Sequence, residues 1–194
     1  SGPLHWWQND GQGNFVQHTV ANLVDAGVLI VADLDSDGDS DVLTRSGDDE
    51  FAWYENDGQQ AFSKRVILPS TRVMSAYVSD FDRDGDLDVI CTDGTRITWQ
   101  ENNGEQEFTE HEIWHSSQPF LDRILAADLD GDGDLDVIST NLSSPRELAW
   151  YENLGSAGFA EHVVATAFQS FDVAIGDLNG DGAFDLFCAR DYAM

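Results

Sequence analysis

The chain has 194 residues, of which 37 are acidic and only 9 are Lys or Arg, so its formal net charge is −28. Binding to nucleic acid and to anionic membrane surfaces depends on Lys and Arg, so this charge argues against both partners. Hydrophobic residues make up 41% of the chain, which is enough for a packed core and excludes a disordered polymer. No apolar run is long enough to span a bilayer as a helix.

The chain opens with two alternating apolar and polar segments, at residues 4–9 and 15–20, on either side of an Asn-Asp-Gly turn. Asn and Gly readily adopt the positive-φ positions of a tight turn, and a period of two indicates β-strands, so this pattern predicts a β-hairpin. The pattern recurs at residues 51–67, 97–113 and 148–164, with a Trp in the first strand of each copy (Trp6, Trp53, Trp99 and Trp150).

Each later hairpin is preceded by an acidic loop that lies between two short apolar segments. The loops span residues 33–41, 80–88 and 128–136, and a fourth loop spans residues 177–185. Their first acids are 47, 48 and 49 residues apart. The flanking segments are short, apolar and rich in β-branched residues, which is typical of buried strands. A complete repeat therefore contains four strands.

The third loop, Asp128-Leu-Asp-Gly-Asp-Gly-Asp-Leu-Asp136, places five carboxylates in nine residues. Such charges repel one another unless a cation neutralises them, and calcium takes six to eight oxygen ligands from a flexible loop. Acids at loop positions 1, 3 and 5 can point at one centre, Gly at position 6 permits a sharp turn, position 7 offers its backbone carbonyl, and the acid at position 9 completes the shell. In the fourth loop, Asn179 keeps an oxygen at position 3, and Ala183 at position 7 has no side-chain oxygen.

We therefore predict one Ca²⁺ in each loop, four in all. The predicted ligand positions are Asp33, Asp35, Asp37, Asp39 and Asp41; Asp80, Asp82, Asp84, Asp86 and Asp88; Asp128, Asp130, Asp132, Asp134 and Asp136; and Asp177, Asn179, Asp181, Ala183 and Asp185. An EF-hand is excluded because it requires flanking helices and a Glu at position 12. Position 12 is here occupied by Thr44, Cys91, Ser139 and Cys188.

Four antiparallel strands in a unit of about 45 residues indicate an all-β fold, a β-propeller built from four-stranded blades. We expect one domain over residues 1–194, with a half-blade at 4–20, blades at about 26–67, 73–113 and 122–164, and a half-blade at 171–190. The two half-blades together make one blade that is split between the termini. Three arrangements remain open: a ring closed within one chain, an eight-bladed ring of two chains, and a fragment of a longer propeller.

Two motifs carry a resemblance to a known family: Ala127-Asp-Leu-Asp-Gly-Asp-Gly-Asp-Leu-Asp-Val137, and Trp150-Tyr-Glu-Asn-Leu-Gly155 followed by Phe159. They resemble the FG-GAP/VCBS repeats, the β-propellers related to the head of the integrin α-subunit. This resemblance implies a propeller with calcium in each loop between the first two strands of a blade. It covers almost the whole chain.

Departures from the repeat are the candidates for ligand binding: Trp7, Trp114, Arg72 and Arg123. The four repeated Trp residues can stack on sugar rings, but their recurrence in every repeat favours packing. No set of nucleophile, base and orienting group is found, so no enzymatic activity is predicted. We expect a secreted, extracellular or periplasmic calcium-binding scaffold for binding or adhesion, with carbohydrate or protein as ligand. The alternatives are an accessory domain of a secreted polysaccharide-active enzyme and a half-ring that assembles with itself.

Overall fold

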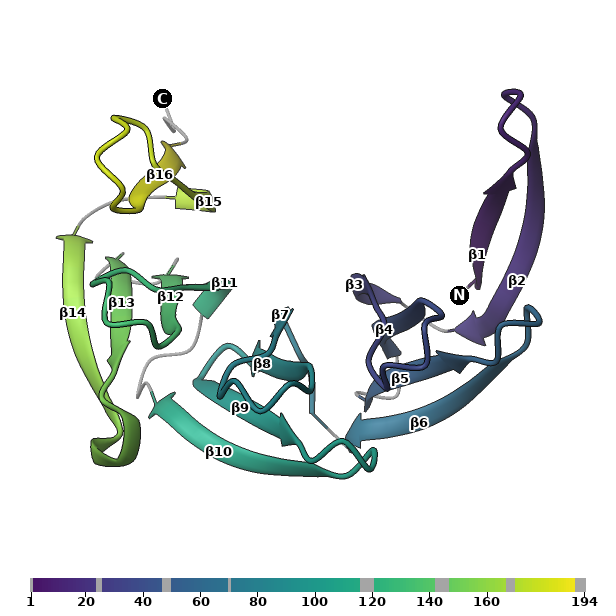
Figure 1. Ribbon diagram of the computed structural model, residues 1–194, viewed down its shortest axis with the longest axis horizontal. Helices are drawn as coiled ribbons and strands as arrows, with labels where there is room; N and C mark the ends of the chain where they lie inside the picture. The colour runs from purple at the N-terminus through teal and green to yellow at the C-terminus, as the bar shows by residue number, and fades with distance from the viewer. Residues whose placement is uncertain are drawn as a thin grey trace. The chain divides into compact units, whose positions relative to one another are not determined.

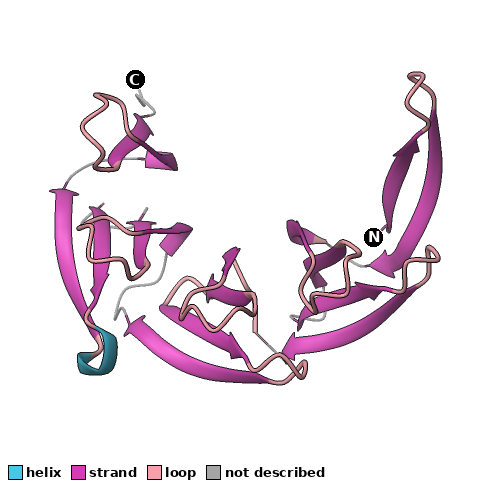
Figure 2. Ribbon diagram, in the orientation of Figure 1, coloured by secondary structure: helices cyan, strands magenta, loops and turns pink. Residues whose placement is uncertain are grey.

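The computed structural model describes residues 2–23, 26–46, 50–69, 71–115, 121–141, 147–166 and 170–190. The described elements are β-strands apart from one short 3₁₀ turn, η1 (Gly155–Ala157) (Figures 1 and 2). Antiparallel four-stranded sheets with strands in sequential order confirm the predicted all-β, propeller-type fold. None of the described helical segments is long and apolar enough to cross a membrane. The chain divides into two units, Ser1–Val73 and Met74–Met194, which are described separately.

The first unit contains one hairpin and one complete sheet. The hairpin pairs β1 (Gly2–Asn9) with β2 (Phe15–Leu23), and the sheet has the order β3 (Gly27–Ala32), β4 (Asp41–Ser46), β5 (Glu50–Asn56) and β6 (Phe62–Leu68). A cluster built on Leu23, Ala52 and Tyr54, with Leu4 and Phe62 against it, packs the hairpin on the sheet. This first hairpin covers the predicted half-blade.

The second unit contains two complete sheets and a second hairpin. The first sheet runs β7 (Ser75–Ser79), β8 (Asp88–Thr92), β9 (Arg96–Asn102) and β10 (Phe108–His115), and the next runs β11 (Leu121–Ala127), β12 (Asp136–Asn141), β13 (Glu147–Asn153) and β14 (Phe159–Thr166). The hairpin pairs β15 (Ser170–Gly176) with β16 (Asp185–Arg190). One apolar cluster joins the two sheets through residues such as Phe81, Ile90, Ile124 and Tyr151. A second cluster, with Ile138 and Val173, joins β11–β14 to the last hairpin.

The second and third strands pair in the same register in the three complete sheets. In β4–β5, Leu43 lies opposite Trp53, and in β12–β13, Ile138 lies opposite Trp150. The last two strands of each sheet are joined by the predicted Asn-x-Gly turns, whose Gly residues have positive φ (for example 68° at Gly58). A β-bulge recurs between the third and fourth strands and increases the local twist.

Candidate calcium loops and inter-sheet pockets

The structure gathers the acids at loop positions 1, 3 and 5 around one point in three of the loops. In each triplet, one carboxylate oxygen from every residue lies within 4.8 Å of the others. The triplets are Asp33, Asp35 and Asp37; Asp80, Asp82 and Asp84; and Asp128, Asp130 and Asp132. The Gly at position 6 makes the predicted turn, with φ of 96° at Gly38, 103° at Gly85 and 102° at Gly133. This geometry brings together the side chains that the sequence assigned to one ion.

The fourth loop has a neutral amide in place of the second acid, and its backbone wraps around the first. Asp177 Oδ1 accepts from the N–H of Gly180 at 2.7 Å, and its Oδ2 accepts from Gly182 at 3.0 Å. These backbone bonds hold the pKa of Asp177 below its ordinary value. Asn179 Oδ1 accepts from the N–H of Asp181 at 2.8 Å. The loop thus lacks the negative charges that the other three carry at positions 3 and 7.

The acid at position 9 anchors its loop to the third strand of the sheet. Asp88 is fully buried. Its Oδ2 accepts from the N–H of Phe81 at 3.0 Å, and its Oδ1 accepts from the N–H of Asn102 at 2.8 Å. The Asn102 side chain donates in turn to the Leu87 carbonyl at 3.1 Å. Asp41 and Asp136 make the equivalent pairs of bonds. In the fourth loop, Asp185 makes the first of these bonds, from the N–H of Leu178 at 2.9 Å.

The electrostatics of the loops indicate negative charge that the protein itself does not neutralise. Burial raises the pKa of Asp88 to about 6, although bonds from Asn102 and Phe81 oppose the shift. Burial and then repulsion from Asp41 and Asp37 raise the pKa of Asp35. Burial and the closeness of like charges both favour the neutral form of a carboxyl, which a bound cation would oppose.

Two observations test whether the loops could hold calcium: a buried carboxylate oxygen without a hydrogen bond, and the chemistry of the donor atoms. Asp80 Oδ1 is buried and has no hydrogen-bond partner among the described atoms. An unsatisfied buried carboxylate oxygen is costly, and a bound cation would satisfy it. The clustered donors are all hard carboxylate oxygens, with no nitrogen or sulfur, which suits calcium and not zinc or copper. The residues present therefore fit the ion that the loops predict.

The side chain at position 7 turns away from the triplet and toward a neighbouring element. A Cβ on Gly58 would collide with the Asp39 carboxylate, and a Cβ on Gly104 would collide with that of Asp86. In the third loop, Asp134 instead faces Arg83 Nη1 at 3.5 Å, across from the preceding loop. The position-7 carboxylates therefore lie outside the triplets, and the predicted use of the position-7 carbonyl stays a prediction.

Two pockets, one in each unit, are lined by equivalent residues of neighbouring sheets. The pocket in the second unit has a volume of about 290 Å³ and lies between the third strand of one sheet and the loop and hairpin of the next. Its lining is Phe81, Asp82, Trp99, Asp134, Asn153, Gly155 and Phe159. The pocket in the first unit measures about 340 Å³ and is lined by Trp6, Val31, Asp39, Ser40, Val42, Asn56, Gly58, Gln60 and Phe62. Five repeat positions are common to both: Trp, Asp at loop position 7, Asn, Gly and Phe.

Each repeated Trp packs against a His or Arg side chain of the strand that follows it. His111 stacks on Trp99 with ring centroids 4.6 Å apart, and its Nε2 lies 2.5 Å from Glu101 Oε2. His162 stacks in the same way on Trp150 and His18 on Trp6, while Arg65 lies over Trp53. The packing role predicted for the Trp set agrees with these contacts, and Trp6 and Trp99 additionally line the pockets.

The four residues proposed from sequence as ligand contacts lie elsewhere. Trp7 is 56% exposed on β1, and Arg72 is exposed. Trp114 packs on Tyr151 at 5.4 Å, at the edge of the core. Arg123 faces Asp172 at 3.8 Å. None of them lines the two pockets described above. The pocket residues Asp134, Asn153 and Phe159 could have been found by asking which repeat positions of adjacent blades meet.

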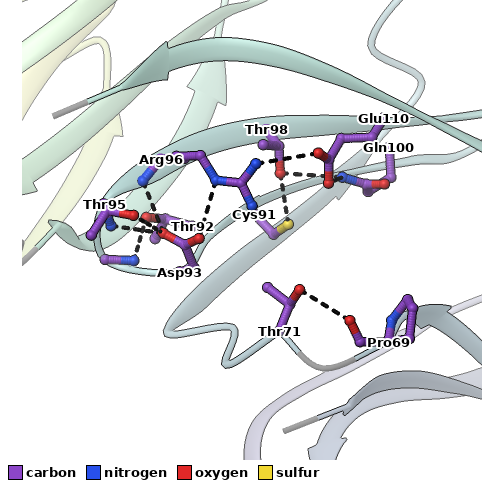
Figure 3. Close-up of polar contacts among 11 residues, drawn as sticks. Pro69, Thr71, Cys91, Thr92, Asp93, Thr95, Arg96, Thr98, Gln100 and Glu110 are labelled. Carbon is purple, nitrogen blue, oxygen red and sulfur yellow. Dashed lines mark hydrogen bonds and ion pairs between the residues drawn. The ribbon is translucent and has the colours of Figure 1, made fainter.

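A polar cluster at the β8–β9 turn is satisfied internally (Figure 3). Asp93 accepts from Thr95 Oγ1 at 2.7 Å and from Arg96 Nε at 3.3 Å, and Arg96 reaches Glu110 at 3.4 Å. Burial raises the pKa of Asp93, but the bonds from Thr95 and Arg96 outweigh it, so the pKa lies below its ordinary value. We assign this cluster to stabilising the turn.

Solved structures with the same fold include two that the chain matches over most of its length. One is a lectin from Agrocybe aegerita, described by its recognition of non-reducing terminal N-acetylglucosamine, with 18% identity, a TM-score of 0.64, and coverage of 94% of this chain and 54% of the lectin. The other is the biofilm matrix protein Bap1 of V. cholerae, with 17% identity, a TM-score of 0.52, and coverage of 88% and 29%. The chain thus spans about half the length of the lectin, and a search of curated proteins finds no match.

The repeats themselves match a family model. The FG-GAP-like repeat model matches residues 33–91, 80–139 and 128–188, so each match begins at one acidic loop and reaches beyond the next. Together the matches cover most of the chain and contain all four loops. This chain belongs to the FG-GAP-like repeat family.

Proposed function

We propose that this chain is a secreted, calcium-binding, non-catalytic module that binds neutral carbohydrate in the pockets between neighbouring sheets. The observation that carries the proposal is the repetition of one lining, Trp, Asp, Asn, Gly and Phe, in pockets of two different sheet pairs. In a chain of repeats, equivalent positions meet between each pair of neighbouring sheets, so the two pockets offer the same contacts to a ligand. A repeated lining is what a multivalent binding protein uses to take the same small ligand at several places.

The chemistry of the pocket at Trp99 suits a sugar. Phe81 lies 5.4 Å from Trp99 and 6.2 Å from Phe159, measured between ring centroids, so three aromatic rings form one apolar wall. Asp82, Asp134 and Asn153 bring carboxylate and amide groups to the same space. An apolar wall with a few convergent polar groups is the usual form of a small-molecule site. Sugars match it because their C–H faces pack on rings while their hydroxyls donate to carboxylates.

Charge selects among sugars. Two carboxylates line the pocket at Trp99, and the whole chain has a net charge of −28. Uronic, sialic and sulfated sugars would be repelled, whereas a neutral sugar gains hydrogen bonds to ionised oxygens, which are stronger than bonds between neutral groups. The fold shared with a lectin that recognises N-acetylglucosamine makes neutral hexoses and N-acetylhexosamines the first ligands to test.

Calcium would be held by the triplets at positions 1, 3 and 5, with the position-7 carbonyl and the position-9 acid. Its contribution is to neutralise the loop carboxylates and fix the loop backbone. A site filled at ten times its Kd adds ~1.4 kcal/mol to stability. Asp82 belongs to a triplet and also lines the pocket, and Asp134 follows another triplet by two residues. The ion would thus order the polar side of the pocket.

A glycan array probed with and without chelator tests the proposal. We expect calcium-dependent binding to neutral glycans without release of cleaved products. Trp99→Ala should abolish binding at its pocket, whereas Trp150→Ala should retain it, because Trp150 makes the same His stack but lines neither pocket. Asp134→Asn and its control Asp86→Asn form a second pair of variants, each of which replaces one carboxylate oxygen with an amide nitrogen. Absence of glycan binding in the calcium-loaded protein, or equal losses in the two Trp variants, would overturn the proposal.

The accessory-domain alternative differs in one measurable respect. A module that serves a polysaccharide-active enzyme would bind the polymer that its partner cleaves, so it should prefer long chains over terminal sugars. Release of reducing ends by the isolated chain would show catalysis and replace both readings.

A further inference from the structure

A third pocket, in the first unit, lies between strand β2 of the hairpin and the sheet β3–β6. It has a volume of about 350 Å³. Leu23, Ser46 and Tyr54 line it and are at most 7% exposed, so the pocket reaches into the packing between hairpin and sheet. Of the described residues, Phe62 is the one that it shares with the pocket at Trp6. It is therefore a separate site from the two carbohydrate pockets proposed above.

Ala21, which lines this pocket, occupies the position at which the second unit carries Trp114. Ala21 lies opposite Leu4 in the β1–β2 pairing, and Trp114 lies opposite Ile97 in the β9–β10 pairing. Each partner precedes the repeated Trp of its strand by two residues, and a β-bulge lies beside each pair. The two residues thus have the same place on the outer strand of their hairpins, but one has an indole ring and the other a methyl group.

In the second unit, the Trp114 ring packs into the contact between the two sheets. Its centroid lies 5.4 Å from that of Tyr151, and both belong to one apolar cluster that also includes Phe159. By strand register, Tyr151 and Phe159 correspond to Tyr54 and Phe62 of the first unit, which line the pocket. The same aromatic pair is thus present in both units, and the first unit leaves the space of the indole ring open. An apolar space left by a missing side chain can bind a small aromatic molecule.

One end of the pocket carries a polar group that the protein does not satisfy. Ser46 is 5% exposed, and its Oγ is buried with no hydrogen-bond partner in the described part of the chain. A buried hydroxyl without a partner is costly, and such groups are rare in folded proteins. A ligand with a hydrogen-bonding group would satisfy it.

The charge at this end of the pocket is already balanced. Lys64 lines the pocket, and its Nζ donates to Glu50, which lies opposite Ser46 in the β4–β5 pairing. Because this ammonium group already has a carboxylate partner and the whole chain has a net charge of −28, an anionic ligand gains little here. The pocket therefore suits a neutral molecule with one polar group.

We propose that this pocket binds a neutral, planar aromatic molecule of the size of indole. Its ring would lie beside Tyr54 and Phe62, as the ring of Trp114 lies beside Tyr151. An N–H or hydroxyl on the ring would bond to Ser46 Oγ. The ligand class follows from the side chain that fills the equivalent place in the second unit.

Calorimetric titration of the full chain with indole is the first test, and we expect one indole bound per chain. Ala21→Trp should abolish binding, because it fills the pocket from within. Val16→Trp is the matched control: Val16 is 56% exposed on the same strand and lines none of the pockets described, so this variant should keep binding. If the unaltered protein shows no saturable binding up to the solubility limit of indole, or if Ala21→Trp binds as well as the unaltered protein, the proposal is wrong.

The reciprocal variant tests the equivalence of the two positions. Trp114→Ala should open a corresponding space beside Tyr151 and raise the stoichiometry from one indole per chain to two. Circular dichroism checks that the variant keeps its β-structure. One indole per chain in folded Trp114→Ala would overturn the assignment of the ligand from the Trp114 ring.

Ser46→Ala tests the polar end. It should weaken indole binding about fivefold, the value of one ordinary hydrogen bond, and leave the binding of 1-methylindole, which lacks the N–H, unchanged. Equal losses for the two ligands would overturn the role of Ser46. Glycan binding is measured on the same variants, and Ala21→Trp should keep it at the pocket at Trp99, so failure of this site and failure of the carbohydrate proposal can be told apart.

Discussion

Replacing Asp88 with Asn should lower the stability of the calcium-loaded protein by about 3 kcal/mol and leave the calcium-free protein almost unchanged. In both states the change keeps the size of a fully buried side chain. It removes one of the two carboxylate oxygens that accept from Phe81 and Asn102. A hydrogen bond to a charged acceptor contributes about 1.5–3 kcal/mol, and the substituted amide turns an N–H toward another N–H.

Without calcium, a second effect of opposite sign cancels this loss. Burial raises the pKa of Asp88 from 3.8 to about 6. At neutral pH, keeping this carboxylate ionised therefore costs roughly 3 kcal/mol, and Asn removes that cost. With calcium bound, the ion already neutralises the charge, so the substitution brings no relief. It also weakens the ion in the second loop, which is worth ~1.4 kcal/mol at tenfold saturation.

The assay is denaturant unfolding at neutral pH, once with saturating calcium and once with chelator. Asp185→Asn is the matched control, because Asp185 occupies the same loop position but is only partly buried and makes one of the two bonds. Its loss with calcium should be smaller than that of Asp88→Asn. Equal destabilisation of Asp88→Asn in the two conditions would refute the reasoning, since Asp88 would then act only as a backbone clamp.

Three further outcomes are expected. A carboxyl with a raised pKa contributes stability below its unfolded pKa of 3.8, and this stability is lost as the pH rises through about 6. The melting temperature of the calcium-free protein should therefore fall across that interval, and the gain in melting temperature on adding calcium should be larger above it. A flat pH profile of the calcium-free protein would count against a buried, unneutralised Asp88. His111→Ala should cost about 1 kcal/mol through the lost stack on Trp99, as measured by unfolding, while Glu112→Ala on the same strand should cost little. Burial raises the pKa of the Cys91 thiol to about 12, so a thiol reagent should modify the partly buried Cys188 first, and rapid modification of Cys91 in folded protein would contradict its buried position.

The fold was predictable because its signals are local and repeated. The period of two in the strands, the Asn-x-Gly turns and the 47–49-residue spacing of the loops each need only a short stretch of chain. The gathering of Asp80, Asp82 and Asp84 follows from the same local geometry, since positions 1, 3 and 5 of one tight loop cannot lie far apart. These features also identified the family.

The pockets were not predictable in this way, because their residues meet through packing between sheets. Trp99 lies on β9 and Asn153 ends β13, and only the contact of the two sheets brings them together. Trp114 is the opposite case. Its departure from the repeat suggested a ligand contact, but the ring packs on Tyr151 of the next sheet. A departure from the repeat can thus reflect core packing as readily as a binding site.

Under the proposed function, calcium and the pocket ligand would share an acidic residue, Asp82, which belongs to a triplet and also lines the pocket. The second carboxylate of the lining, Asp134, lies outside the triplets and faces Arg83 at 3.5 Å. An ion in each loop would offset the charge locally and leave ordered oxygens as hydrogen-bond acceptors. A sugar in the pocket would then meet fixed acceptors beside the aromatic rings. Loop order and pocket shape would then be linked, because Asp82, which would hold the ion, also lines the pocket.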